Sequence, residues 1–497
     1  MKIMKQYLNK KSVSIFVICL FLMLLFFAFQ ISRRTKSVEK EKYTELLMYR
    51  KGEKPTNYTD LMAFINQRLQ KELGASLQIQ YLGWGEYDKK MSVITSSETN
   101  YDIAFASNYR TNAQKGIYYD LTTLAPKYAK ETYENLNPYY IQGNTINGRL
   151  FALPTNANVY GQKRMAFEQE LVERYQFDLS KVKELHDLEP FLSIIKEKEP
   201  HLTPINFGPE TRVGQMDYVY NDQIPLGIDP SNYSFKIINP YQESEQMIND
   251  LTTMHRYYQK GYLNPNSAIL ENDIAVTEKG WFVRFPTQGP FDYGDMALSK
   301  KAGRPILSIP WSKPIIDNMQ IFVSNFVISS GSKHPEKALE VLNLINTDKE
   351  LLTTMVYGLE NQGWEKKENN RIRILPSYHP SRAIGGAWSV GDNQTIYLDE
   401  EVTLEQIQTR EESIIEAEVS PLLGFSFDAT AVTREMLAVS NIMNQYLAPL
   451  HSGTISPEKT LPILNEKLEE AGLSIVQKEM QKQFDFFLSQ EKGAFSE

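Results

Sequence analysis

One stretch near the N-terminus switches between two hydrophobic periods, and this switching limits the fold more than any other feature of the chain. The segments Glu45–Arg50, Leu77–Leu82 and Tyr101–Ala106 predict strands, the third of them buried. Between them, Thr59–Leu73 predicts a helix, because its apolar residues follow a helical period, and Tyr87–Ser96 predicts a second helix. A β-α-β-α-β order is typical of a parallel sheet with helices on its faces.

The rest of the chain continues this alternation of helices and strands. Further helices are predicted at residues 163–175, 185–198, 243–260, 335–346, 398–418, 431–447 and 457–490, the last interrupted at Leu473–Ser474. Further strands are predicted at residues 147–154, 306–309 and 321–328. A chain of 497 residues is too long for one simple core, which indicates two lobes.

An apolar segment near the N-terminus predicts a membrane anchor. Val13–Ile31 would span roughly 28 Å as a helix, close to the ~30 Å hydrocarbon thickness of a bilayer. Lysines precede this segment, as in the n-region of a signal sequence. We therefore expect residues 1–36 to form a signal-anchor or transmembrane segment. The remaining chain would then lie on the extracytoplasmic face of the cell membrane.

The single cysteine, Cys19, lies inside this apolar segment. Bulky residues precede it and a further apolar run follows it, so it is a poor lipidation site, and we do not expect lipidation there. Ala28–Gln30 is a weak signal-peptidase site, because glutamine stands where a small residue is preferred. An uncleaved anchor is our expectation, and a cleaved or lipidated form is the alternative.

The charge of the chain outside residues 1–36 argues against nucleic acid as a partner. Of the 53 Lys and Arg, 46 lie in this region together with all 61 Asp and Glu, which gives a formal net charge of −15. Such an acidic surface is not suited to nucleic acid or to wide contact with anionic lipid.

The sequence offers no positive sign of an enzyme or of a cofactor. Its six histidines are scattered without metal-ligand spacing, and no nucleophile elbow, Walker loop or dinucleotide fingerprint occurs. Acidic pairs are abundant, but spacing alone does not assign a glycosidase acid and nucleophile. We therefore expect a non-enzyme with no cofactor and no metal.

Several motifs, in this order, resemble the extracellular solute-binding proteins of family 1, and in particular the large lipoprotein-type members that serve bacterial sugar importers. The motifs are Tyr81–Met91 (YLGWGEYDKKM), Tyr101–Asn108, Lys115–Leu121, Ile146–Pro154, His334–Ala338, Leu342–Asp348, Gly424–Asp428 and Leu461–Leu468. The last two resemble the C-terminal domain of this subgroup. The resemblance covers about residues 43–490.

The resemblance implies an α/β, two-lobed periplasmic-binding-protein-like fold that closes by a hinge, with a helical C-terminal region. Lobe 1 would comprise residues 43–153 and about 312–375, and lobe 2 residues 154–311 and about 376–497. The implied role is the receptor of an ABC importer, which captures a carbohydrate, most often an oligosaccharide, and delivers it to permease subunits. We expect a monomer held at the membrane by its N-terminal helix.

Sugars stack on aromatic rings, and amides and carboxylates bind their hydroxyls, so such residues after strands are candidates for the site. The candidates are Trp84, Glu86, Tyr87, Ser107, Asn108, Asn156, Tyr160, Asp217, Trp281, Trp311 and Trp388. Trp84, between two glycines that allow the backbone to turn, is the foremost; its alternative is a core plug. Trp388 lies in a loop that resembles a W-x-x-G-N stretch of the family, although Asp392 intrudes there.

Five of the other candidates also have a structural alternative. Glu86, Tyr87, Ser107 and Asn108 could instead cap the helices that follow them, and Asp217 could be an ordinary solvated acid. Two other functions also remain open for the whole protein. One is a membrane-tethered glycan sensor or adhesion module without transport, and the weaker one is a glycan-active enzyme.

Overall fold

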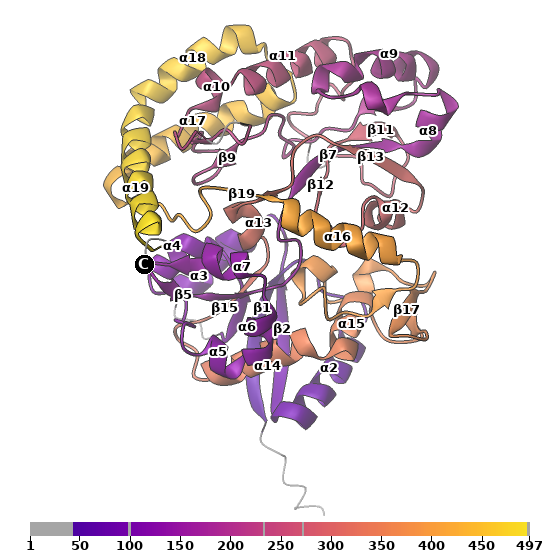
Figure 1. Cartoon of the computed structure of the whole chain (residues 1–497), viewed down its shortest axis with the longest axis vertical. Helices are drawn as coiled ribbons and strands as arrows, with labels where there is room; N and C mark the ends of the chain where they lie inside the picture. Colours follow the sequence, from indigo (N-terminus) through magenta and orange to yellow (C-terminus); the bar gives the residue numbers. More distant parts are fainter. Residues whose placement is uncertain (1–42, 98–100, 232–233, 271–272, 495–497) are drawn as a thin grey trace, which may run out of the picture.

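The computed structural model describes residues 43–97, 101–231, 234–270 and 273–494. It consists of two α/β lobes, one above the other in Figure 1. We call the part built on strand β1 (Thr44–Lys51) the first lobe and the part built on β7 (Gln162–Glu168) the second lobe. Helix α16 (Leu404–Glu416) runs across their junction (Figure 1).

The first lobe is built on a five-stranded sheet in the order β2-β1-β3-β15-β6. Strand β1 is parallel to β2 and β3, whereas β15 is antiparallel to β3 and β6. The other strands are β2 (Ala75–Leu82), β3 (Ile103–Phe105), β15 (Asn325–Ile328) and β6 (Ala152–Pro154). The predicted β-α-β-α-β order is thus confirmed, and the carboxyl ends of β1, β2 and β3 are directed toward the second lobe (Figure 1).

Helices cover this sheet, and α2 (Tyr58–Leu73) shows why they form. Its apolar side chains Leu61, Ile65 and Leu69 recur at helical spacing and are buried, and the helix ends at Gly74 in the left-handed region. The remaining helices of the first lobe are α3 (Tyr87–Ser96), α4 (Tyr109–Gln114), α5 (Ala125–Tyr128), α6 (Lys130–Asn135), α7 (Pro138–Asn144), α13 (Asn318–Phe322), α14 (Pro335–Thr347) and α15 (Lys349–Tyr357).

The second lobe has its own sheet in the order β12-β7-β11-β8, and β13 also pairs with β7. These strands are β12 (Thr287–Gln288), β11 (Trp281–Arg284), β8 (Thr203–Ile205) and β13 (Ile306–Pro310). The helices are α8 (Gln169–Arg174), α9 (Glu189–Lys198), α10 (Pro240–Glu243), α11 (Glu245–Gln259), α12 (Met296–Ala302), α17 (Thr433–His451), α18 (Pro457–Glu470) and α19 (Leu473–Ala494). Helices α17 to α19 form the outer side of this lobe (Figure 1).

Short elements complete the fold. Paired short strands are β4 (Thr145–Ile146) with β5 (Arg149–Leu150), β9 (Asp217–Tyr218) with β10 (Gly227–Ile228), and β14 (Ile315–Ile316) with β19 (Glu418–Val419). A three-stranded sheet contains β16 (Trp364–Lys366), β17 (Arg371–Ile374) and β18 (Leu398–Asp399). Short 3-10 helices, η1 to η6, cover Leu179–Lys181, Leu185–Leu188, Pro290–Asp292, Pro380–Arg382, Ala387–Ser389 and Thr430–Val432.

Two of the predicted elements are wrong in part. Residues 163–168 are the central strand β7 rather than the start of a helix, and a helix, α8, begins only at Gln169. Both faces of this strand are covered, so Met165, Ala166 and Phe167 are all buried and the alternation typical of a strand is absent. The predicted strand 321–328 likewise begins as helix α13 and becomes a strand only at Asn325.

Each lobe has its own hydrophobic core. The first core joins β1 to β3 with α2, α14 and α15, and the second joins β7 and α11 with α17 to α19. The C-terminal helices therefore belong to the core of the second lobe. Ile384 and Val390 pack in the first core, although the predicted boundary near residue 375 assigns them to the second lobe.

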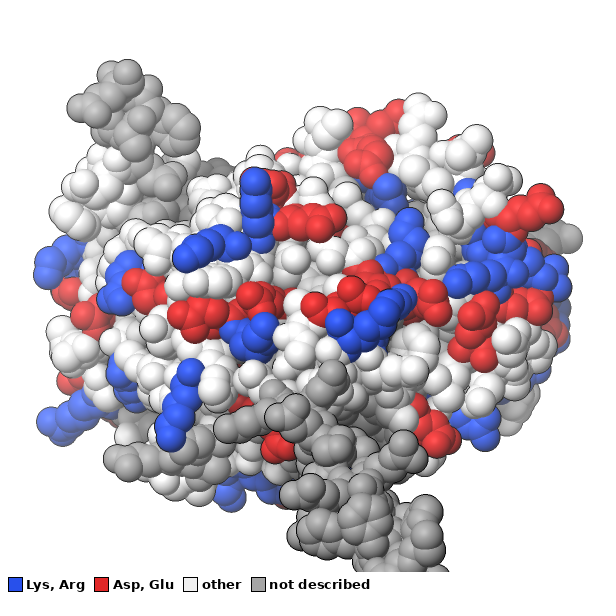
Figure 2. Space-filling view, turned by 90° about the horizontal axis from the view of Figure 1, so that it is seen from below, with Lys and Arg blue, Asp and Glu red and all other residues white. Residues whose placement is uncertain are grey.

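The predicted anchor, Val13–Ile31, and Cys19 lie outside the described residues. Within the ranges that the structure describes, no helix combines the length and apolar character needed to cross a membrane. The face of the first lobe at the amino end of β1 carries acidic and basic side chains interspersed with one another (Figure 2).

Candidate functional site

The loops that follow β1, β2 and β3 meet at one edge of the first sheet. Lys51 ends β1 opposite Leu82 at the end of β2, so the loop that carries Trp84 begins beside it. Ser107 follows β3, which pairs with β1 on the other side. Parallel strands place their carboxyl ends together, and this is where open α/β sheets bind ligands.

A pair of tryptophans, of which Trp84 is exposed and Trp388 is half-buried, occupies this edge. The Trp84 side chain is 52% exposed, and its ring centroid lies 6.0 Å from that of Trp388 at an angle of 34° between the planes. Lys51 Nζ lies 5.5 Å from the Trp84 ring centroid. Trp84 is therefore not a core plug, because much of its ring faces solvent.

Aromatic contacts connect this pair to the core of the lobe. The half-buried Trp388 ring meets Phe105 edge to face at 6.5 Å, and Phe105 meets Phe326 in the same way at 5.9 Å. Phe105 lies on β3 and Phe326 on β15, in the middle of the sheet. The exposed indoles thus rest on rings that the sheet fixes in place, which limits their freedom before any ligand binds.

Polar groups border the tryptophan pair. Ser107 Oγ donates a hydrogen bond of 2.6 Å to Asp88, and Asp88 also forms an ion pair of 3.8 Å with Lys51. Asn108, next to Ser107, is exposed and has a left-handed backbone with φ of 44°. No side-chain cap from Asn108 to α4 is present in the described structure, so its amide is available to a ligand.

The two glycines beside Trp84 do not act as the sequence suggested. Neither Gly83 nor Gly85 has positive φ among the described residues, so the turn does not require glycine there. A Cβ on Gly85 would meet nothing within 4 Å. The exposure of Trp84 therefore comes from the position of the loop and not from glycine flexibility.

The structure contradicts Tyr87 as a binding residue. Its side chain is fully buried, and its hydroxyl donates a hydrogen bond of 2.5 Å to the carbonyl of Phe105. Glu86 is exposed but is paired with Lys90 at 2.5 Å on the outside of α3, and this hydrogen bond lowers the pKa of Glu86. Tyr87 is thus a support under the site rather than a contact for ligand.

Two further tryptophan candidates are core residues. Trp281, on β11, is fully buried between Arg284 and Arg304, which leaves its ring no face for a sugar. Trp311 is also buried, with its ring centroid 5.1 Å from that of Phe285. Residue type and chain position alone could not separate these rings from Trp84.

Asn156 and Tyr160 follow β6 at a crossing between the lobes, as predicted, but both are buried. The Asn156 amide donates hydrogen bonds to Asn135 O at 3.1 Å and to Asp392 Oδ2 at 3.3 Å. The Tyr160 hydroxyl donates to Ser413 Oγ of α16 at 2.9 Å. Their polar groups hold the crossing together and are not free for ligand.

Asp217 belongs to a buried cluster between the lobes. Its carboxylate accepts a hydrogen bond from Ser420, and burial together with the nearby Asp317 raises its pKa to about 8. Arg110 of the first lobe donates to the carbonyl of Val219 in the second lobe at 3.3 Å. Asp217 is therefore a junction residue and not a solvated acid or a free hydroxyl acceptor.

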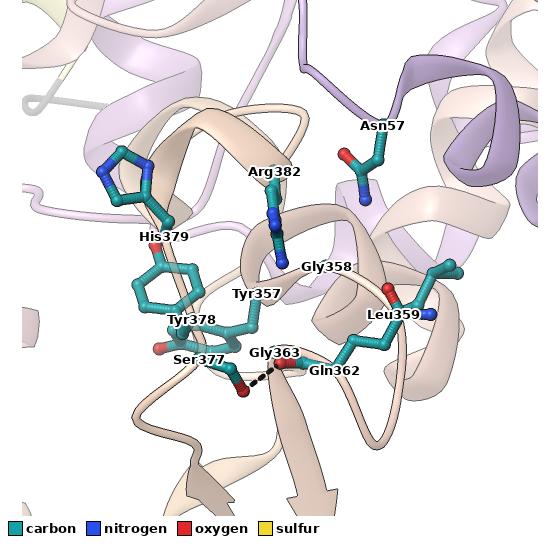
Figure 3. Close-up of a pocket in the computed structure, with 10 residues that line it drawn as sticks. All are labelled: Asn57, Tyr357, Gly358, Leu359, Gln362, Gly363, Ser377, Tyr378, His379 and Arg382. Carbon is teal, nitrogen blue, oxygen red and sulfur yellow. Dashed lines mark hydrogen bonds between the residues drawn. The ribbon is translucent and has the colours of Figure 1, made fainter.

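Two cavities lie away from the tryptophan pair. One, beside Asn57 and Tyr357 in the first lobe, has about 10 Å³ and room for a single water at most (Figure 3). The other is an open groove of about 570 Å³ on the second lobe, where Glu189 pairs with Arg256 and Lys260. Neither is lined by a residue that the sequence singled out.

In the described part of the chain, no group of three His, Cys, Asp or Glu side chains is placed to hold a metal ion. Sequence reasoning missed three residues of the tryptophan site: Arg50, Lys51 and Asp88. Arg50 and Lys51 could have been found from their position at the end of β1, which is parallel to the strand before Trp84. For Asp88 the sequence carried no such signal.

The chain is similar to known proteins over about 90% of its length. Residues 421–489, which contain α17, α18 and most of α19, match a family described as a domain of unknown function, DUF3502. A carbohydrate ABC transporter substrate-binding protein of Streptococcus pneumoniae is 43% identical over 449 residues, 90% of this chain and 91% of that protein.

Solved structures give the same result. The N-glycan transport solute-binding protein NgtS of Streptococcus pneumoniae is similar with a TM-score of 0.86 and 42% identity, over 90% of this chain and 100% of that chain. A complex of the same protein with Man5GlcNAc matches with a TM-score of 0.81 and 42% identity, over 90% and 99%. A solute-binding protein for HMO from Bifidobacterium longum infantis shares the fold, with a TM-score of 0.56 and 14% identity over 90% and 99%. The two-lobed fold, the match along nearly all of the described chain and the identity to a curated relative agree, and the chain belongs to the carbohydrate ABC transporter substrate-binding proteins.

Proposed function

We propose that this protein is the extracytoplasmic receptor of an ABC importer and that its ligand is an oligosaccharide of the N-glycan type. The ligand class is supported by the structures of NgtS with Man1GlcNAc and Man5GlcNAc. The receptor role is supported by the 43% identity to a carbohydrate transporter's binding protein. We assign the protein no chemistry of its own, because it would deliver its ligand unchanged.

The observation that carries the proposal is the Trp84–Trp388 pair at the carboxyl edge of the first sheet, in which Trp84 is exposed and Trp388 half-buried. An indole offers the flat apolar surface on which the C–H face of a pyranose packs. Lys51, Asp88 and the Asn108 amide, next to this surface, supply the donors and acceptors that sugar hydroxyls need. In this proposal ligand lies on the pair and the second lobe closes over it.

Five further expectations belong to the same proposal. The chain is a member of the family 1 solute-binding proteins, acts as a monomer and is held at the membrane by residues 1–36. Its permease partners receive the ligand at that membrane. Lobe 1 comprises residues 43–153 and about 312–375, with Ile384 and Val390 packed against it, and lobe 2 comprises most of the remainder.

Import can be tested in bacteria that make the protein and in matched bacteria that lack it. The proposal predicts that a labelled Man5GlcNAc accumulates inside the first cells only, and that restoring the gene restores accumulation. Equal accumulation in both would refute the importer role. Binding without accumulation would instead favour a membrane-tethered glycan sensor.

A further inference from the structure

Arg50, the residue before the end of β1, is a buried cation without a counter-charge. Its side chain is 2% exposed, and among the described residues no carboxylate lies within ion-pair distance of its guanidinium. Its Nε has no hydrogen-bond partner in the part of the chain that the structure describes. A buried, unpaired charge is costly, so its presence calls for a function that an apolar residue would not supply.

The contacts of Arg50 lead to the segment that carries Trp388. One terminal nitrogen, Nη2, donates to the carbonyl of Ser389 at 2.9 Å and to its Oγ at 3.0 Å. Ser389 Oγ in turn donates to Gly386 O at 3.0 Å and so closes a tight turn around Trp388. The guanidinium also lies 5.7 Å from the ring centroid of Phe326, at the base of the aromatic contacts under the site.

The turn is shaped to admit this guanidinium. A Cβ on Gly385 would stand 2.5 Å from Arg50 Nη2, so a side chain there would displace the arginine or the turn. A further long-range hydrogen bond holds the turn, in which Thr155 Oγ1 donates to Trp388 O at 3.1 Å. Long-range hydrogen bonds thus hold the carbonyl groups of Trp388 and Ser389, in addition to the local bonds of their short 3-10 helix.

We infer that Arg50 is a positioning residue for the glycan site, because it fixes the 385–389 turn and so holds Trp388 beside Trp84. This inference rests on the proposed function for its ligand. Arg50 does not touch the ligand, since it is buried beneath the pair. Arg50 fixes the distance and tilt between two rings that come from distant parts of the chain. A preorganised site binds its ligand more tightly than one that must become ordered on binding.

The test uses Arg50→Met, which keeps an apolar stem without charge or donors, and Arg50→Lys, which keeps the charge but has a single donor nitrogen in place of the planar guanidinium. Two neighbouring indoles give an exciton couplet in circular dichroism, and Trp84–Trp388 is the one indole pair in contact among the described residues. Trp84→Phe identifies the couplet, because it removes one partner. Affinity for Man5GlcNAc is measured on the same samples by calorimetry.

We expect Arg50→Met to lose most of the couplet and at least tenfold in glycan affinity. Arg50→Lys should have a couplet and an affinity between those of Arg50→Met and those of the wild type. Should Arg50→Met fail to fold, Gly385→Ala and Ser389→Ala test the same contact from the other side and should weaken both signals. A folded Arg50→Met protein with an intact couplet, or with affinity within twofold of the wild type, would overturn the inference. Absence of binding by the wild type would refute the proposed function instead, and the couplet would still decide whether Arg50 positions the pair.

Discussion

The ring centroids of Trp84 and Trp388 lie 6.0 Å apart, although one ring follows β2 and the other comes from a turn near the C-terminal third of the chain. The strands of the first sheet bring the first of these segments to the carboxyl edge, and Arg50 and Thr155 hold the second there. This relationship carries the proposed function. In the proposed site, Trp84 and Trp388 contact the ligand, whereas Arg50 and Thr155 support the turn that carries Trp388.

Replacement of Trp84 by alanine should weaken glycan binding by at least about 1 kcal/mol, because an aromatic stacking surface is lost. Stability should change little, since the side chain is half-exposed. Calorimetry and thermal melting measure the two quantities on one sample. Val93→Ala is the matched control, because Val93 is an exposed apolar residue of the next helix and should leave affinity unchanged. Unchanged affinity with a lowered melting temperature in Trp84→Ala would make Trp84 a packing residue.

Trp281→Ala should lower the stability of the protein and leave its glycan affinity unchanged, the opposite of Trp84→Ala. Its ring is fully buried in the second lobe, so its removal should cost about 3–5 kcal/mol of unfolding free energy. Urea denaturation measures this loss. Protein that remains folded should bind glycan as the wild type does. A stable variant with lost affinity would return Trp281 to the set of binding residues.

Gly85→Ala should be tolerated. Gly85 has no positive φ and has open space at its Cβ position, so alanine there should leave affinity unchanged. Gly363→Ala is the contrasting variant. In Gly363→Ala the new Cβ would lie 1.7 Å from the carbonyl oxygen of Tyr357, and we expect severe destabilisation. Melting temperatures of the two variants test the contrast. A large loss of stability in Gly85→Ala would show that the turn does require glycine.

Asp217 predicts a pH dependence of stability. Burial and the charge of Asp317 raise the folded-state pKa of Asp217 to about 8, whereas the pKa of an aspartate in the unfolded chain is about 3.9. The folded state therefore holds more protons between these values, and this stabilisation, complete below about pH 4, is lost as the pH rises through about 8.

The unfolding free energy should fall by up to about 1.4 kcal/mol per pH unit for this one group. Urea midpoints measured from pH 5 to pH 8, a range of about three units within that window, follow the effect. Asp217→Asn should show a shallower slope, since it removes the titrating group. Identical slopes in the two proteins would contradict the raised pKa.

Much of the fold was predictable, because the local pattern and the tertiary environment agree. The helix at 59–73 and the strand at 77–82 could be found from their hydrophobic periods alone. The strand at 163–168 could not, because both of its faces are buried and its apolar residues do not alternate. Residues 163–168 form a strand because they pair with β11 and β13, which lie far along the chain.

The site was less predictable than the fold. Trp84 and Trp281 both stand near glycines at strand ends, yet one faces solvent and the other lies between two arginines in the core. Exposure depends on which elements cover a ring, and the sequence does not contain that information locally. Arg50 was missed for a related reason, since only the fold shows that its partner is Ser389.

The central claim is that the Trp84–Trp388 pair binds an N-glycan type oligosaccharide. Calorimetry of the wild type and of a Trp84→Ala, Trp388→Ala double variant with Man5GlcNAc, Man1GlcNAc and an unrelated peptide tests it most directly. We predict saturable binding of at least one of the glycans by the wild type, no binding of the peptide, and a loss of at least tenfold in glycan affinity for the folded double variant. Peptide binding without glycan binding, or equal glycan affinity in both proteins, would contradict the claim.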